Sequence, residues 1–265
     1  MSDRIRWGIL GTGNIASQFA SALNALPDAE LAAVGSRAQS TADAFADRFG
    51  IPRRHPTYEN LARDPDVDVV YIATPHALHR ENSILCLEAG KAVLCEKPFA
   101  INAREAEEVF ASAAKNHLFV MEAMWTRFIP AVKEAINWAT SGEIGDISEV
   151  QASFGFRADP AESPALFNPS LGGGSLLDVG IYPITLAHMV FDGVLPARVN
   201  SIATIGDTGV DERADIVLEY PGGALAVLSS SITADAPGDA YILGTKGSIR
   251  LHHSFWNASR VSIRR

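Results

Sequence analysis

The sequence is poor in cysteine and has no long hydrophobic run. Of its 265 residues only Cys86 and Cys95 are cysteines, and both lie in apolar patterns without the spacing of metal ligands. The low count predicts neither a disulfide framework nor a metal site, and it favours a reduced, cytoplasmic compartment. No apolar stretch approaches the roughly 20 residues of a membrane span, and the N-terminal residues lack the apolar segment of a signal peptide. We therefore expect neither a membrane anchor nor secretion.

Basic charge is also scarce. The chain has 22 Lys and Arg residues against 31 Asp and Glu residues, a formal net charge of -9 at pH 7, and no basic cluster. Nucleic acids and anionic membrane surfaces attract positively charged patches, so we expect neither as a partner. We interpret the acidity as a feature that favours solubility. The length suits two modest domains, which the patterns below place at residues 1–122 and 123–265.

The most informative stretch follows the first apolar run. Residues 5–10 predict a buried strand, residues 11–16 read Gly-x-Gly-x-x-Ala, and apolar residues then recur at helical spacing. This motif at a strand-to-helix turn is typical of a dinucleotide pyrophosphate site, although a plain glycine turn gives the same pattern. The helix N-terminus attracts the anion, and glycine lets the backbone approach it. The residues assigned here to cofactor binding are Gly11, Thr12, Gly13, Asn14 and Ile15.

The end of the second predicted strand, residues 31–34, indicates which dinucleotide binds. The strand leads into Ser36 and Arg37, where an NAD site usually has Asp or Glu. An acidic residue would bind the ribose 2′-hydroxyl of NAD, whereas hydroxyl and guanidinium groups attract the 2′-phosphate of NADP. We therefore predict that Ser36 and Arg37 bind NADP, with NAD possible. The alternative is that Arg37 is a solvated loop residue.

Two further strand ends are expected at the cofactor crevice. Residues 68–74 form a buried-strand pattern, and residues 92–95 lead into Glu96-Lys97-Pro98. Ligands of open α/β sheets bind at the carboxyl ends of the strands, and Pro98 is a candidate for a cis peptide bond that would direct the Lys97 ammonium. The alternative for Lys97 is a surface lysine paired with Glu96, and the alternative for His79 is a role at the start of a helix. The residues assigned to cofactor binding are Thr74, Pro75, His79, Glu96 and Lys97.

The pattern changes after a sixth predicted strand at residues 118–121. Residues 128–140 predict a helix, 147–156 a strand, and 159–170 a long loop that is a candidate lid. A further helix, residues 176–191, has Asp178, Tyr182 and Thr185 at spacings of four and three, so one helical face would carry all three. Polar groups on so apolar a helix need partners. The predicted substrate-binding residues are Trp125, Arg127, Phe154, Phe156, Arg157, Asp178 and Thr185.

The last third of the chain reads as β structure. The expected strands are residues 199–205, 214–220, 224–232, 240–243 and 248–252, and the last residues also have a strand pattern. Glycine-containing hairpin turns separate neighbouring strands, which makes those pairs antiparallel. The predicted fold class is therefore α/β: an N-terminal Rossmann domain with a doubly wound parallel sheet, followed by a C-terminal α+β domain with an open, mainly antiparallel sheet.

Four motifs together resemble the glucose-fructose oxidoreductase/inositol dehydrogenase (Gfo/Idh/MocA) family over essentially the whole chain. They are Gly11-x-Gly13, Ser36-Arg37, Glu96-Lys97-Pro98 and Asp178-x-x-x-Tyr182. Residues 124–128 and Tyr182 look most like the branch of dimeric dihydrodiol dehydrogenases and NADP-dependent D-xylose dehydrogenases. The resemblance implies catalytic roles for Lys97 and Tyr182 and a homodimer or higher homo-oligomer formed through the open sheet. Family chains are usually several tens of residues longer, which leaves two alternatives open: a natural end at residue 265 or a C-terminal truncation.

The leading hypothesis is the reversible oxidation of a secondary alcohol of a sugar or cyclic diol by NADP. Loss of a hydride from the carbinol carbon requires a base for the hydroxyl proton. Tyr182 is the candidate, because a cation such as Lys97 favours the phenolate of a group whose free pKa is about 10, and Asp178 would orient the substrate or the lysine. The alternatives are a non-catalytic NADP-binding sensor or regulatory protein, and a hydrolase or isomerase that retains its cofactor.

Overall fold

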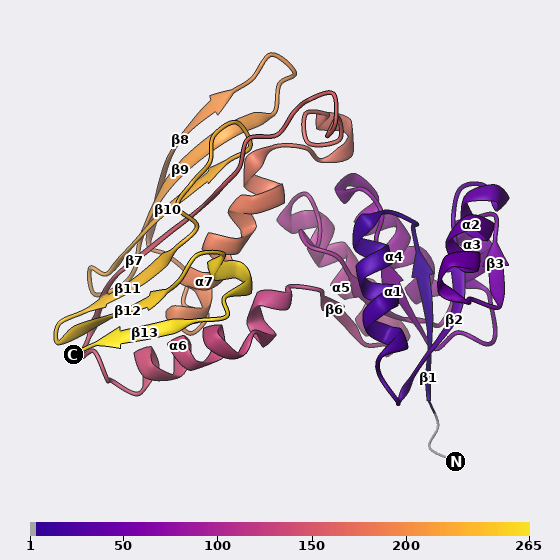
Figure 1. The fold of residues 1–265 in the computed structure, drawn as a ribbon, viewed down its shortest axis with the longest axis horizontal. Coiled ribbons are helices and arrows are strands. Elements are labelled where there is room, and N and C mark those ends of the chain that lie inside the picture. The colour runs from indigo at the N-terminus through magenta and orange to yellow at the C-terminus, as the bar shows by residue number, and fades with distance from the viewer. Residues whose placement is uncertain (1–3) are drawn as a thin grey trace. The chain divides into compact units, whose positions relative to one another are not determined.

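The computed structural model describes residues 4–265, and the chain divides between Ala123 and Met124 into two compact units (Figure 1). The division falls one residue beyond the predicted boundary. Among the described residues, no helix combines the length and apolarity needed to cross a membrane. In the same part of the chain, no three His, Cys, Asp or Glu side chains gather in a way that could hold a metal ion.

The first unit contains a six-stranded parallel sheet in the order β3-β2-β1-β4-β5-β6. The order reverses between β1 and β4, which in doubly wound sheets marks the ligand crevice at the carboxyl ends of the strands. This confirms the predicted Rossmann architecture. The strands are β1 (Ile5–Leu10), β2 (Ala29–Gly35), β3 (Arg53–His55), β4 (Val69–Ile72), β5 (Ala92–Cys95) and β6 (Val120–Glu122).

Helices cover both faces of this sheet. The helices are α1 (Asn14–Asn24), α2 (Gln39–Phe49), α3 (Tyr58–Ala62), α4 (His79–Glu88), α5 (Ala103–Asn116) and the short 3₁₀ helix η1 (His76–Leu78). One buried cluster holds residues of α1 and α2, and a second holds residues of α3, α4 and α5. Two helix ends have the capping residues that the sequence predicts. Gly50 ends α2 in a left-handed conformation, and the Asn102 side chain accepts a hydrogen bond from Glu105 N at the start of α5.

The second unit contains a seven-stranded sheet in the order β13-β12-β11-β7-β10-β9-β8. All neighbouring pairs are antiparallel except β7 and β10, so the sheet is mainly antiparallel, as predicted. The strands are β7 (Ile147–Gly155), β8 (Arg198–Ile205), β9 (Asp211–Glu219), β10 (Leu225–Ser231), β11 (Ala240–Gly244), β12 (Gly247–Leu251) and β13 (Val261–Arg264).

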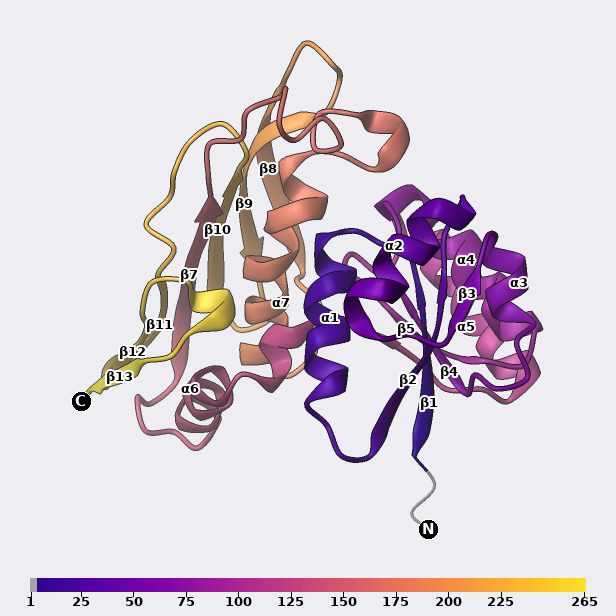
Figure 2. The same cartoon turned by 45° about the vertical axis from the view of Figure 1, so that its right-hand side comes forward.

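Two helices, α6 (Pro130–Thr140) and α7 (Ile181–Val190), lie on the same side of this sheet (Figure 2). α7 packs on β7 and β10, α6 packs on β12 and β13, and both helices share one core with the sheet. The other face of the sheet carries no helix of the described chain. On that face Val217 pairs with Val227, and Val227 pairs with Gln151, in a row across three central strands.

Two predicted helices in this unit are partly wrong. The helix predicted from residue 128 begins at Pro130, because Ile129 is extended and Phe128 belongs to a separate 3₁₀ turn, η2 (Trp125–Phe128). The helix predicted for residues 176–191 opens with a π-helical turn, η4 (Leu176–Gly180), and becomes regular only in α7. Two further 3₁₀ turns are η3 (Pro169–Leu171), at the end of the predicted loop, and η5 (Phe255–Asn257).

Candidate functional site

The glycine motif forms the connection from β1 to α1, and its two glycines have different reasons to be glycine. Gly11 has φ +108°, and a Cβ there would lie 2.5 Å from the carbonyl oxygen of Ala73, so the fold itself requires glycine. Gly13 has no atom of the chain within 4 Å of the position of a Cβ. Glycine at 13 is therefore not needed for packing within the chain, which agrees with a requirement imposed by a ligand.

The N-terminus of α1 is open to an anion. Gly13, Asn14 and Ile15 are exposed, and α1 has no acidic residue in its first turn. The N-cap residue is Gly13, which has no side chain to cap this helix start. Since the first N–H groups of a helix have no partner within the helix and carry partial positive charge, they can hold phosphate oxygens. This arrangement suits the pyrophosphate of a dinucleotide.

Of the two residues predicted to bind the cofactor after β2, Arg37 is exposed and Ser36 is buried. Ser36 is buried, and its hydroxyl lies 2.6 Å from that of Thr41, which itself donates to the Ala38 carbonyl. The Ser36 proton is therefore donated to Thr41, and Ser36 keeps only acceptor capacity toward a ligand. Arg37 is exposed. Of the two residues, Arg37 is the one able to contact a 2′-phosphate with a donor.

The turn that carries Lys97 is held by side chains on both sides. The Lys97–Pro98 peptide bond is cis, as the sequence suggests. The backbone N–H of Lys97 donates to Glu96 Oε2 at 3.1 Å, and that of Phe99 donates to Glu122 Oε1 at 2.9 Å. The carbonyl of Pro98 lies 2.7 Å from His79 Nδ1. The sequence does not predict the contribution of Glu122, which lies at the end of the neighbouring strand β6.

His79 is fully buried, and it joins two strand ends. Its Nδ1 lies 2.7 Å from Pro98 O, and its Nε2 lies 2.9 Å from Thr74 O. Burial lowers the pKa of His79 to about 4, although the two carbonyls favour the charged ring. Both ring nitrogens thus face the backbone, and the side chain connects the end of β4 to the Lys97 turn.

Glu96, beside Lys97, is a largely buried carboxyl group. Burial raises its pKa, and a hydrogen bond donated by the hydroxyl of Tyr71 partly opposes that rise. Tyr71 lies in β4 and is 1% exposed, and its ring stacks on Phe19 with centroids 3.8 Å apart. The carboxyl that holds the Lys97 N–H is therefore fixed by the core of the first unit.

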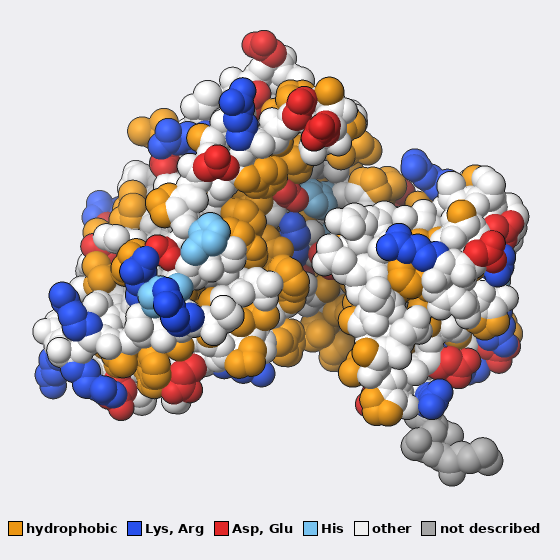
Figure 3. Space-filling model, viewed as in Figure 1, with side chains coloured by type: hydrophobic (Ala, Val, Ile, Leu, Met, Phe, Trp, Pro, Cys, Tyr) orange, Lys and Arg blue, Asp and Glu red, His pale blue; other side chains and the backbone are white. Residues whose placement is uncertain are grey.

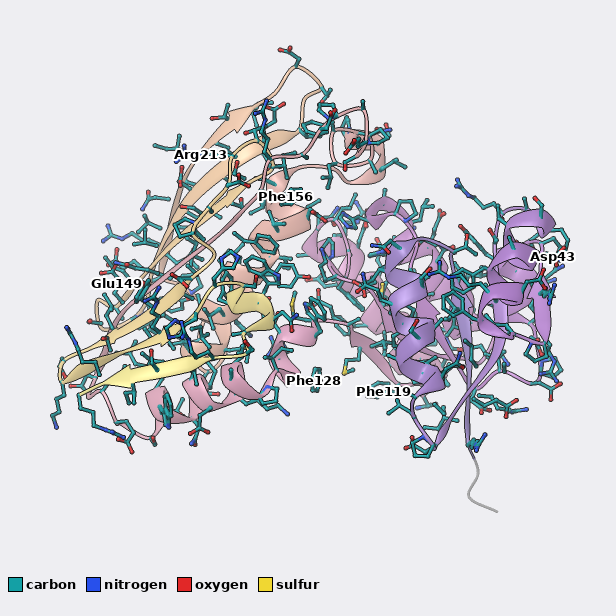
Figure 4. The ribbon with its side chains drawn as sticks, in the orientation of Figure 1. Asp43, Phe119, Phe128, Glu149, Phe156 and Arg213 are labelled. Atoms are coloured by element: carbon teal, nitrogen blue, oxygen red, sulfur yellow. The ribbon has the colours of Figure 1, made fainter. Side chains whose placement is uncertain are left out.

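In the second unit, Tyr182 lies in an aromatic cluster. Tyr182 is 6% exposed, and its ring centroid is 5.4 Å from that of Phe154. The ring of Phe154 stacks on that of Trp256 with centroids 3.4 Å apart and an interplanar angle of 7°, and its centroid lies 6.4 Å from that of Phe156. Phe156 directly follows the end of β7 (Figure 4). The hydroxyl of the buried Thr126 donates to the Trp256 carbonyl at 2.8 Å, which fixes η5. Hydrophobic side chains gather on this part of the unit beside η5 (Figure 3).

The other predicted substrate-binding residues differ in exposure. Asp178 lies in the π-helical turn η4 and is partly buried, whereas Thr185 of α7 is 6% exposed. Trp125 is 40% exposed and lies one residue before the buried Thr126. Arg127 and Arg157 are exposed. The structure thus brings together Phe154, Phe156 and Tyr182, and adds Trp256, which the sequence does not predict.

Two family profiles match the chain, one for each unit. Residues 5–124 match a profile described as an oxidoreductase family with an NAD-binding Rossmann fold. Residues 131–250 match the GFO/IDH/MocA C-terminal domain. Among curated relatives, the mouse trans-1,2-dihydrobenzene-1,2-diol dehydrogenase is 41% identical over 98% of the chain and 78% of its own length. The human enzyme of the same name is 39% identical, with the same shares covered.

Solved structures match over nearly the whole chain as well. A 3-ketoreductase from Actinomadura kijaniata, in complex with NADP and TDP-benzene, has a TM-score of 0.88 and 30% identity, covering 99% of the chain and 82% of its own. An aldose-aldose oxidoreductase from Caulobacter crescentus, complexed with glycerol, has a TM-score of 0.87 and 27% identity, covering 99% and 83%.

Proposed function

The chain belongs to the Gfo/Idh/MocA family of NAD(P)-dependent oxidoreductases, and from this membership we propose that it oxidises a secondary alcohol of a cyclic diol, using NADP. The relatives at about 40% identity act, by name, on a dihydrobenzenediol. The observation that carries the proposal is the aromatic cluster of Phe154, Trp256 and Tyr182, since flat apolar surfaces suit an unsaturated ring whose two hydroxyls need few polar partners.

The cofactor assignment is supported by three features of the first unit. The uncapped start of α1 supplies N–H donors for the pyrophosphate, and Gly13 leaves room for the phosphates to approach. Arg37 supplies an exposed guanidinium for a 2′-phosphate, and an acidic residue that would repel it is absent at the end of β2. When bound, the nicotinamide ring accepts the hydride that leaves the carbinol carbon.

The chain's own residues must then manage the hydroxyl proton. We assign the role of base to the phenol oxygen of Tyr182, because hydride loss leaves a carbonyl only if the hydroxyl proton is removed. We also assign a catalytic role to Lys97, whose backbone turn is held by Glu96 and Glu122, because an ammonium group favours negative charge on a substrate oxygen. Asp178 would accept a hydrogen bond from the second hydroxyl and orient it. In the reverse direction the Tyr182 phenol returns the proton.

A second candidate substrate is an aldose. The support for it is the 27% identical aldose-aldose oxidoreductase, together with Arg127, Arg157 and Thr185, which offer polar groups that an open polyol needs. The non-catalytic NADP-binding reading is not favoured, because named dehydrogenases and ketoreductases match over the whole chain.

We also propose a cytoplasmic homodimer formed through the helix-free face of the second sheet. Val217 and Val227 are 37% and 39% exposed at its centre and pair with each other in register. Apolar side chains on an uncovered sheet face favour association with a second copy. The cytoplasmic assignment is supported by Cys86 and Cys95, which are buried, unpaired thiols.

The test of the reaction compares two tyrosine variants. Tyr182→Phe removes the phenol oxygen and should abolish most turnover, measured as reduced-nicotinamide absorbance with a trans-dihydrobenzenediol and with a panel of aldoses. NADP affinity should stay nearly unchanged. Tyr220→Phe is the matched control, because Tyr220 is also buried in the second unit but stacks on Phe191 away from the Phe154 cluster. Unaltered turnover in Tyr182→Phe would refute the assignment, and product formed without an absorbance change would indicate a cofactor-retaining hydrolase or isomerase.

A further inference from the structure

The helical segment that carries Asp178 and Tyr182 begins with an uncommon turn. Residues Leu176–Gly180 form a π-helix, and the regular helix α7 starts only at Ile181. A π-helix forms hydrogen bonds between residues i and i+5, occurs mostly as single turns, and is frequent at functional sites. Such a turn needs support from its surroundings, and the surrounding contacts come from the sheet.

A carboxylate from β9 caps the start of this turn. Asp211 Oδ2 accepts hydrogen bonds from Leu176 N at 2.7 Å and from Ser175 Oγ at 2.8 Å. The first N–H groups of a helix lack partners within it and carry partial positive charge, so a carboxylate stabilises this end twice, as acceptor and as anion. The segment is thereby bonded to β9.

The hydroxyl of Ser175 continues the connection to β10. Ser175 Oγ also lies 3.0 Å from Ser230 Oγ, and the two serines are 0% and 2% exposed. A carboxylate only accepts, so the Ser175 proton goes to Asp211, and Ser230 must donate its own proton to Ser175. The result is a buried chain of hydrogen bonds with one direction, from β10 through the helix start to β9.

Ser230 touches the segment a second time, at the far end of the π-turn. A Cβ on Gly180 would lie 3.1 Å from Ser230 Oγ and 3.2 Å from Ser230 Cβ. Ser175 and Gly180 are five residues apart; in an α-helix they would point about 140° apart, whereas one turn of π-helix brings both toward the same side chain. The π-turn and Ser230 therefore fix the rotation of the segment against the sheet.

We propose that Asp211, Ser175 and Ser230 form a positioning network for the reaction, in which the sheet sets the place of the Tyr182 phenol and the Asp178 carboxylate through the π-turn. Tyr182 follows Gly180 by two residues, so a shift or rotation of the turn moves the phenol directly. The inference rests on the catalytic role proposed above for Tyr182. It adds three residues that do not touch the substrate to the set on which turnover depends.

The first experiment uses the contact between Gly180 and Ser230. Gly180→Ala alone should lower kcat severalfold, because the added methyl would lie 3.1–3.2 Å from Ser230 and can be relieved only by a shift of a few tenths of an ångström, which the turn passes on to Tyr182. NADP affinity, a property of the first unit, should not change. In a Ser230→Gly background only Leu176 Cδ1, the far end of a flexible side chain, remains close to the added methyl, at 3.2 Å. Gly180→Ala should therefore leave kcat as in Ser230→Gly alone and should raise the unfolding temperature, since alanine is the better helix former.

The second experiment separates the carboxylate from general surface charge. Asp211→Asn should lower kcat with the affinity for NADP unchanged, while Asp207→Asn, an exposed aspartate in the turn between β8 and β9, should leave both as in the wild type. Turnover is divided by the fraction of chains whose second unit is folded at the assay temperature, measured by thermal unfolding followed by circular dichroism, so that a merely destabilised variant keeps its normal kcat. If the wild type turns over substrate and neither Gly180→Ala nor Asp211→Asn lowers kcat, the network is refuted while the proposed function stands. The same conclusion follows if the effects of Gly180→Ala and Ser230→Gly on kcat add up in the double variant. A wild type that never changes nicotinamide absorbance overturns the proposed function, and this inference with it.

Discussion

The buried imidazole of His79 gives a prediction about stability and pH. The ring has an ordinary pKa of 6.5 that burial lowers to about 4 in the folded chain, with His76 and Lys97 as the nearby charged groups that lower it further. The folded state therefore binds the proton more weakly than the unfolded state. The contribution of the neutral ring to the free energy of unfolding should be complete above pH 6.5 and should be lost as the pH is lowered from 6.5 toward 4.

The size of this loss of stability follows from the two pKa values of His79, in the unfolded and in the folded chain. A shift of one pKa unit corresponds to about 1.4 kcal/mol, so the folded chain should lose about 3 kcal/mol of unfolding free energy across this range from His79 alone. The carbonyls of Pro98 and Thr74, 2.7 and 2.9 Å from the ring nitrogens, act in the opposite direction, because a charged ring can donate to both. Burial has the larger effect, so the net loss on acidification should remain.

The assay compares the wild type with His79→Gln, which can still donate a hydrogen bond but does not titrate. Urea unfolding followed by circular dichroism, at intervals from pH 4 to pH 8, gives the difference in unfolding free energy between the two chains. Other titrating groups cancel in that difference. A difference that stays constant with pH would refute the assignment of a neutral ring. A wild type that gains stability relative to His79→Gln on acidification would show that a charged imidazole bridges the two carbonyls.

Four other substitutions have distinct expected results. Gly11→Ala should strongly lower the melting temperature, because its Cβ would lie 2.5 Å from a backbone oxygen. Gly13→Ala should leave the melting temperature unchanged and should lower the affinity for NADP measured by titration. Equal behaviour of the two variants would contradict the different roles assigned to the two glycines. Phe154→Ala should cost roughly 1–3 kcal/mol, less than a fully buried phenylalanine because the ring is partly exposed, and should raise KM for the cyclic diol more than for an aldose. Val227→Lys should convert a dimer to a monomer in sedimentation with the fold intact, and an unchanged sedimentation coefficient would rule out this face as the interface.

Periodicity and strand-end chemistry predict the first unit well. A parallel sheet places every carboxyl end at one edge, so the glycine turn, Arg37 and the Lys97 turn could be assigned to one crevice from the order of the strands. The elements that the sequence does not predict, β3 and α3, have only three and five residues, which is too short for a periodic pattern.

The second unit shows where sequence patterns stop being sufficient. A spacing of four between Asp178 and Tyr182 predicts an α-helical face, and nothing local distinguishes it from a π-turn that depends on Asp211 and Ser230. Trp256 stacks on Phe154 although the two are far apart in sequence, so neither local pattern contains the contact. The parallel pairing of β7 with β10 is equally non-local. Such contacts depend on tertiary packing.

That pairing has a consequence for the order of events during synthesis. Glu149 of β7 meets Leu225 of β10, and Val150 meets Ile242 of β11, so the middle strand of the second sheet has no neighbour until most of the chain has left the ribosome. The Rossmann unit finds all its strand partners before residue 123. We expect nascent chains ending near residue 200 to hold a protease-resistant first unit joined to a digestible remainder, because distant strand pairing is slow and requires closure of a long loop.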